Sequence, residues 1–142
     1  MMPESRIPIL MLKGVLVVSV QVDLSDDMVR RLRHDTTLEI ERTHARAVVI
    51  DLTGVDLMDS HISRAIRDLA IVASMMGAQT AICGLNPLVA VTLVEMGMGM
   101  EGVRSFLALE DAIDALAVPG DRYGRELVDV VLEFEQREHE LC

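Results

Sequence analysis

The sequence predicts an α/β fold, a mixed β-sheet of about four to five strands with helices packed on it. Short stretches rich in Val and Ile alternate along the chain with segments whose apolar residues recur at helical spacing. The dipeptide Lys13-Gly14 separates two apolar stretches and offers a tight turn, which predicts one antiparallel hairpin. With 142 residues, of which 51% are hydrophobic, the chain is long enough for one domain with a buried core.

The central element of this prediction is a strand followed by a helix. Residues 47–50 are apolar and rich in β-formers, and Leu52 follows a single Asp, which indicates a buried strand in the middle of the sheet. Residues 53–56 are mostly small or polar and indicate a loop. The pattern then becomes helical, and we expect Ser60 to be the N-cap. The stripe that this helix should bury consists of Ile62, Ile66, Leu69, Ala73 and Met76.

A hairpin of two strands and then a helix are expected before the central strand. Residues 7–13 and 14–22 should form the strands of the hairpin. Ser25 should cap the next helix, because its hydroxyl can accept a first-turn N–H and two aspartates follow it at the positive end of the helix dipole. The residues of this helix that are spaced by four and can face the sheet are Met28, Leu32, Thr36 and Ile40.

Further strands and helices alternate after the central pair. A strand is expected over residues 78–83, and Pro87 should open a helix that stops at Gly97. A short strand at residues 106–107 should precede a last helix of the domain over residues 110–116.

The dipeptide Pro119-Gly120 divides the chain into a domain, residues 1–117, and an acidic C-terminal extension, residues 118–142. The extension is predicted to be helical, with an apolar stripe formed by Tyr123, Leu127, Val130, Val131 and Phe134. Such a stripe either docks on its own domain or binds a partner, since an isolated helix of this length needs packing to persist.

Composition restricts the partners and the compartment. A formal net charge of −10 argues against nucleic acid, because too few basic groups are present to neutralise a run of phosphates, and favours protein partners. Cys83 and Cys142 match neither a metal site nor a disulfide framework, which favours a reducing compartment. Because the sequence has no signal peptide and no apolar run long enough to span a membrane, we expect a cytoplasmic protein without membrane contact.

No motif indicates catalysis, a metal or a cofactor. The segment from Gly97 to Gly102 matches G-x-G-x-x-G by letter, but it follows a helix and contains a carboxylate where phosphates would bind. The histidines show neither the i,i+4 pairing of a metal site nor a motif that would place a serine or carboxylate beside them for catalysis. The sequence therefore favours a protein that is not an enzyme.

Two interpretations of Ser60 follow from its predicted position. A serine before a helix is most often only a cap. It is also a candidate phosphoacceptor, because free N–H groups and the positive end of the helix dipole stabilise an added phosphate. The residues around it do not decide between these interpretations.

Three runs of residues resemble a known family. They are Asp51-Leu52-Thr53, Met58-Asp59-Ser60 and the segment from Gly84-Leu85-Asn86-Pro87 through Val94-Glu95-Met96-Gly97. From about Pro8 to Leu116 the chain resembles the STAS domain, and more narrowly the RsbS-type stressosome antagonists of that family. Broader anti-anti-sigma relatives continue Asp-Ser with Ser-Gly, whereas His61, Ile62 and Ser63 follow here, which favours the stressosome branch.

The resemblance implies a STAS fold, phosphorylation of Ser60 by a serine/threonine kinase of the RsbT type, and assembly with RsbR-type STAS proteins and with further copies of the chain. Candidate partner contacts beside Ser60 are Asp56, Asp59, His61 and Ser63. The implied function is a non-enzymatic scaffold in a stress response that sequesters the kinase until Ser60 is phosphorylated. The alternatives are an anti-anti-sigma factor that binds an anti-sigma kinase and a STAS domain that senses a small ligand.

Overall fold

Five strands form one mixed sheet in the spatial order β1-β2-β3-β4-β5. The computed structural model describes residues 7–20, 25–56, 58–95, 97 and 102–117. The helices and strands are, in chain order, β1 Ile9–Leu12, β2 Val15–Ser19, α1 Asp26–Thr43, β3 Ala47–Asp51, α2 Ser60–Met75, β4 Gln79–Cys83, α3 Pro87–Glu95, β5 Arg104–Phe106 and α4 Leu109–Leu116.

The predicted hairpin is present at one edge of the sheet. Strands β1 and β2 pair antiparallel, with Leu12 opposite Val15. Lys13 and Gly14 both have positive φ, 52° and 78°, as a two-residue type I′ turn requires. The other neighbours, β2 with β3, β3 with β4 and β4 with β5, are parallel, so the predicted mixed sheet is confirmed.

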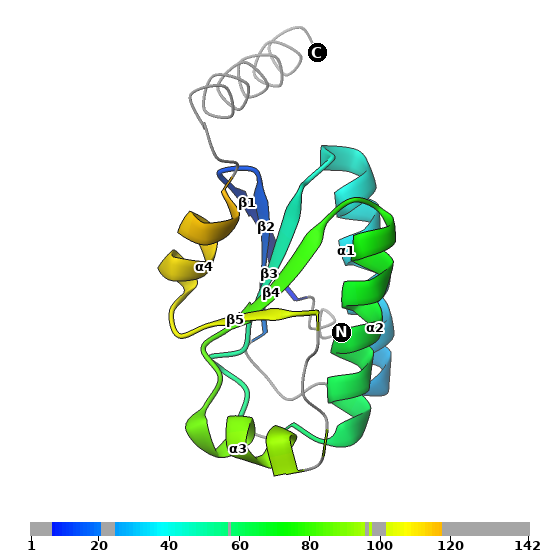
Figure 1. The fold of residues 1–142 in the computed structure, drawn as a ribbon. Coiled ribbons are helices and arrows are strands. Elements are labelled where there is room, and N and C mark those ends of the chain that lie inside the picture. The colour runs from blue at the N-terminus through cyan, green and yellow to red at the C-terminus, as the bar shows by residue number, and fades with distance from the viewer. Residues whose placement is uncertain (1–6, 21–24, 57, 96, 98–101, 118–142) are drawn as a thin grey trace, which may run out of the picture.

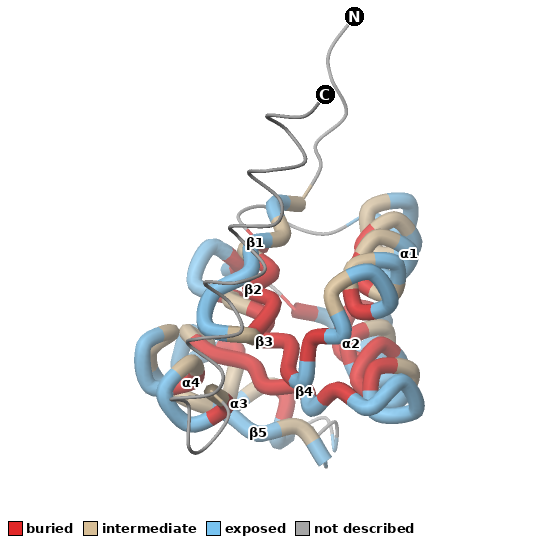
Figure 2. The backbone as a smooth tube through the Cα atoms, turned by 90° about the horizontal axis from the view of Figure 1, so that it is seen from above, coloured by how far each residue is buried: buried red, intermediate tan, exposed pale blue. Residues whose placement is uncertain are grey.

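Helices cover both sides of the sheet (Figures 1 and 2). α1 and α2 pack on one side, where the core contains the predicted α2 residues Ile62, Ile66, Leu69 and Ala73. α4 lies on the other side and packs with Val49 and other small residues of the strands. Because β3 is central and covered on both sides, its first four residues are fully buried.

Several predicted boundaries are wrong by a few residues. Met76 is not in the buried stripe, because α2 ends one residue earlier and Met76 is 38% exposed at its C-cap. The last strand is residues 104–106 instead of 106–107, since its pairing with β4 ends at Phe106 and leaves Leu107 exposed. The extension 118–142 and residues 98–101 of the Gly97–Gly102 motif lie outside the described residues.

The ends of β3 and β4 are locked together by a close contact. The Asp51 carboxylate accepts hydrogen bonds from the backbone N–H of Thr53 at 3.0 Å and from its hydroxyl at 2.5 Å. Gly84 follows β4 with φ of +73°, and a Cβ there would overlap the Thr53 hydroxyl. Only glycine therefore allows both the backbone conformation and the approach, and this contact fixes where the loop to α2 begins.

We predict that Gly84→Ala lowers the free energy of unfolding by about 2–5 kcal/mol, the sum of about 1–2 kcal/mol for left-handed backbone and about 1–3 kcal/mol for overpacking. Urea unfolding followed by circular dichroism measures this loss. Gly77→Ala is the control, because Gly77 has φ of +88° but open space at the Cβ position. It should lose only the backbone contribution, so an equal loss in both variants would show that contact with Thr53 is unimportant.

Candidate functional site

The loop between β3 and α2 presents its polar residues at the surface and anchors itself with apolar ones. Val55 and Met58 are buried in the core beneath α1 and α2. The N–H of Val55 donates to the carbonyl of Leu52 at 3.0 Å, which closes a turn after the strand. Asp56 and Asp59 are left exposed on either side of Met58.

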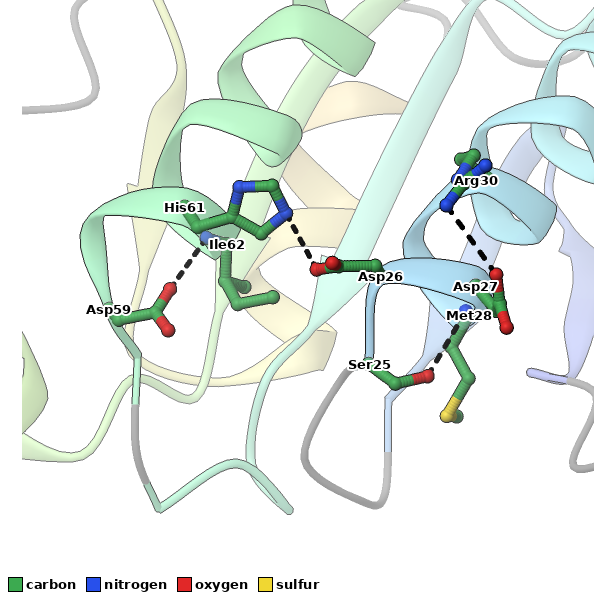
Figure 3. Close-up of polar contacts among 8 residues, drawn as sticks. All are labelled: Ser25, Asp26, Asp27, Met28, Arg30, Asp59, His61 and Ile62. Carbon is green, nitrogen blue, oxygen red and sulfur yellow. Dashed lines mark hydrogen bonds and ion pairs between the residues drawn. The ribbon is translucent and has the colours of Figure 1, made fainter.

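The N-cap of α2 is Asp59, so the prediction that Ser60 is the cap is wrong. Asp59 has extended backbone angles, φ −99° and ψ 178°, and its Oδ1 accepts the N–H of Ile62 at 2.8 Å (Figure 3). Ser60 is the first helical residue. Asp and Ser are about equally good caps, so capping preference alone could not decide between these two adjacent residues. In the structure the Asp59 carboxylate also interacts favourably with the helix dipole.

Ser60 is exposed on the first turn of α2, and among the described residues its hydroxyl has no hydrogen-bond partner. Ser63 is different, since its side chain is only 1% exposed and its hydroxyl donates to the Asp59 carbonyl at 2.9 Å. Ser63 is therefore part of the packing beneath the first turn, and its role as a partner contact stays a prediction. Of the two serines in this turn, Ser60 is the one that a partner can reach.

The N-terminal turns of α1 and α2 lie side by side (Figure 3). Nε2 of His61 lies 2.8 Å from Oδ1 of Asp26, both side chains being mostly exposed. As predicted, Ser25 caps α1, and its Oγ accepts the N–H of Met28 at 3.3 Å. Because both helices follow neighbouring parallel strands, β2 and β3, both begin at the carboxyl edge of the sheet.

A groove of about 230 Å³ runs between α1 and α2 from this point, and the His61 imidazole lies in its wall. Its charged lining consists of three arginines and two aspartates, namely Arg30, Arg33, Arg64, Asp26 and Asp68. Charges of both signs thus line the groove, on a chain whose formal charge is −10. Because His61 in the groove wall follows Ser60 directly, the exposed acidic loop and this mixed-charge groove meet at the start of α2.

Sequence reasoning did not find the pairing of His61 with Asp26, although it had singled out each residue separately. The available signal was positional, because both residues were expected in the first turns of helices that follow strands of one sheet. It also did not find the contact of Gly84 with Thr53, although both residues belong to the runs that carry the family resemblance. Adjacency of the strands was the missing information in each case.

The described part of the chain contains no group of side chains that could hold a metal ion. No group of three or more His, Cys, Asp or Glu side chains converges there. Burial, together with the carboxylates of Asp51 and Glu110, raises the pKa of the Cys83 thiol to about 12, so this thiol stays protonated and unreactive at neutral pH. No helix among the described residues is both long and apolar enough to cross a membrane.

A family model described as the STAS domain matches residues 6–112. The chain therefore belongs to the STAS domain family, as its motifs predicted. No functionally curated protein matches the sequence.

Similar solved structures support the RsbS-type branch of the family. A Ser-to-Glu variant of RsbS from Moorella thermoacetica is 28% identical with a TM-score of 0.69, over 79% of this chain and 95% of that one. A chain from the stressosome, described as a signal integration and transduction hub, is also 28% identical, with a TM-score of 0.68 over 77% and 95% of the two chains. The unphosphorylated anti-sigma factor antagonist SpoIIAA is 17% identical with a TM-score of 0.59, over 77% of this chain and 94% of that one, and shares the fold.

We predict that Asp59→Ala lowers the free energy of unfolding by about 0.5–2 kcal/mol, because it leaves the Ile62 N–H without its acceptor and removes a charge from the helix dipole. Chemical denaturation measures the change. Asp56→Ala is the matched control, since Asp56 is an exposed acidic residue of the same loop that does not cap α2. Equal stability of the two variants would contradict the capping role.

Proposed function

We propose that this chain is a non-enzymatic stress-response regulator and stressosome scaffold that sequesters a serine kinase and releases it when Ser60 is phosphorylated. The observation that carries the proposal is the Ser60 hydroxyl on the first turn of α2, exposed and without a hydrogen-bond partner among the described residues, in a STAS domain similar to RsbS. The burial of Ser63 supports Ser60 as the proposed acceptor within this turn, because a kinase needs an accessible hydroxyl.

A phosphate on Ser60 would add about −1.5 to −2 charges. The helix dipole favours negative charge at this end by about 0.3–1 kcal/mol. Asp59 already occupies the Ile62 N–H, however, and two unit charges about 4 Å apart repel by about 1 kcal/mol even in water. Attraction and repulsion are therefore of similar size, and salt reduces both.

It follows that phosphorylation changes the surface without unfolding α2. The helix is held by its buried stripe, which runs from Ile62 in the first turn to Ala73, and the exposed Ser60 lies outside that stripe. Negative charge concentrates around Ser60, Asp56 and Asp59, and a kinase docked there would face repulsion and unpaired charge. We propose Asp56, Asp59 and His61 as contacts of that kinase, which would be of the RsbT type.

The proposed assembly is a complex with RsbR-type STAS proteins and further copies of the chain. Its support is the likeness to a stressosome chain and a group of exposed apolar side chains on α3, namely Leu88, Val91 and Val94. Exposed apolar patches are typical of protein interfaces. The scaffold would be residues 1–117, with residues 118–142 as a separate acidic extension, and the proposed location of such an assembly is the cytoplasm.

We predict that Ser60→Ala keeps a cognate RsbT-type kinase bound in the presence of ATP, whereas the wild type releases it. Ser60→Asp should weaken binding only in part, because it supplies one charge and no phosphate geometry. Pull-down of the kinase with and without ATP, with mass spectrometry of the phosphosite, makes the measurement. Ser74→Ala is the matched control, an exposed serine at the other end of α2 that should behave as wild type. Phosphate found on Ser63 or Thr92 with Ser60 unmodified would overturn the mechanism.

We also predict self-association or co-assembly with RsbR-type proteins. Light scattering over a range of concentrations should give a mass above that of the 15.7 kDa chain, either alone or in such a mixture. Val91→Asp should reduce the measured mass, since it places a charge in the apolar α3 patch, whereas Glu95→Asp should not. A constant monomer mass under all conditions would exclude the scaffold role.

A further inference from the structure

The face of the sheet that carries α4 is only partly covered by the described residues. α4 packs against β3, β4 and β5 (Figure 2). Leu10 and Leu12 of the edge strand β1 lie opposite Val17 and Val15 and so point to this same face, because directly paired residues share a side of the sheet. Leu10 is nevertheless 58% exposed and Leu12 is 44% exposed. These two leucines form the β1 patch.

The β1 patch is continuous with the core beneath α4. Val15, the partner of Leu12 across the hairpin, packs in the same cluster as Leu116, the last residue of α4. The chain therefore leaves the described domain close to the patch, at Ala117. Two exposed leucines on a sheet face next to a buried cluster are a surface that an amphipathic element can complete.

The segment after Ala117 carries an apolar stripe of suitable length and can reach the β1 patch. Its apolar stripe from Tyr123 to Phe134 would be about 18 Å long as a helix, compared with about 13 Å for the four residues of β1. From Ala117 to Tyr123 is six residues (123 less 117), which span up to about 20 Å when extended. Pro119-Gly120 provides a place for the chain to turn.

We propose that residues 121–135 form an amphipathic helix that docks its apolar stripe on the β1 patch of its own chain and completes the α4 layer of the sheet. The extension begins beyond residue 112, where the family match ends, so this helix is an addition to the shared domain. It goes beyond the proposed function, because it requires neither the kinase nor Ser60. Docking would also remove Leu10 and Leu12 from water, which favours it by the hydrophobic effect.

Tyr123 provides a direct test, because it is the only tyrosine and the chain has no tryptophan. Acrylamide quenching of tyrosine fluorescence in the full chain therefore reports on the extension alone. We expect Tyr123 to be protected in the wild type and several-fold more quenchable in Leu12→Asp. Leu38→Asp is the matched control, since Leu38 is an exposed leucine of α1, 50% accessible, and should leave Tyr123 protected.

A reciprocal pair of variants keeps the test valid if Leu12→Asp disturbs the hairpin. Leu127→Asp changes the stripe itself and should expose Tyr123, because burying an unpaired charge is unfavourable. Val128→Asp is its control, since residue 128 lies off the stripe, and should leave Tyr123 protected. Circular dichroism of each variant checks that the domain stays folded.

Three results would overturn the proposal. The first is a wild-type Tyr123 that is quenched as fully as a free tyrosine at every concentration. The second is protection that is lost on dilution as the chain becomes monomeric, which would assign the contact to a second copy. The third is protection that survives Leu12→Asp and is lost in Val91→Asp, which would place the docking site on α3. Each of these results leaves the role of Ser60 untouched.

Discussion

The structure depends on the burial of β3 from both sides. Val48 and Ile50 belong to the core beneath α1 and α2, and Ala47 and Val49 to the core beneath α4, so all four side chains are removed from water. Complete burial of a Val or Ile side chain contributes about 1.5–3 kcal/mol. Parallel neighbours on both edges satisfy the backbone of the strand. The position of Asp51, at the carboxyl end of β3, is thereby fixed for the loop that follows.

This constraint explains why the surface around Ser60 can be charged without loss of the fold. The loop is tied to the sheet by the contact of Thr53 with Gly84, and the helix after it is held by a buried stripe that begins at Ile62. Ser60 takes part in neither of these contacts; it is exposed and has no hydrogen-bond partner among the described residues. A modification of Ser60 changes the surface that a partner contacts, whereas the buried contacts that stabilise the domain lie elsewhere.

Local rules worked best where one factor dominates. Ser25 was identified as the cap of α1 because two aspartates follow it where first-turn carboxylates interact favourably with the helix dipole, and the structure confirms it. At α2 two residues of equal capping preference stand side by side, and Asp59 takes the position that was predicted for Ser60. The burial of Ser63 was not predicted; its hydroxyl is satisfied by a backbone carbonyl in the same turn.

The sequence by itself determined the α/β class, the mixed sheet with its hairpin and most of the stripes of α1 and α2, because periodicity and turn residues are local signals. The STAS family was indicated by the motif runs that resemble it, and the family match over residues 6–112 agrees. Only the tertiary structure decided that His61 meets Asp26, that Gly84 must remain without a side chain, and that Leu10 and Leu12 stay exposed on the part of the sheet face that α4 leaves uncovered. Each of these depends on which strands are neighbours and how far a helix extends over them. Such distances between segments remote in sequence are set by packing, and no local pattern encodes them.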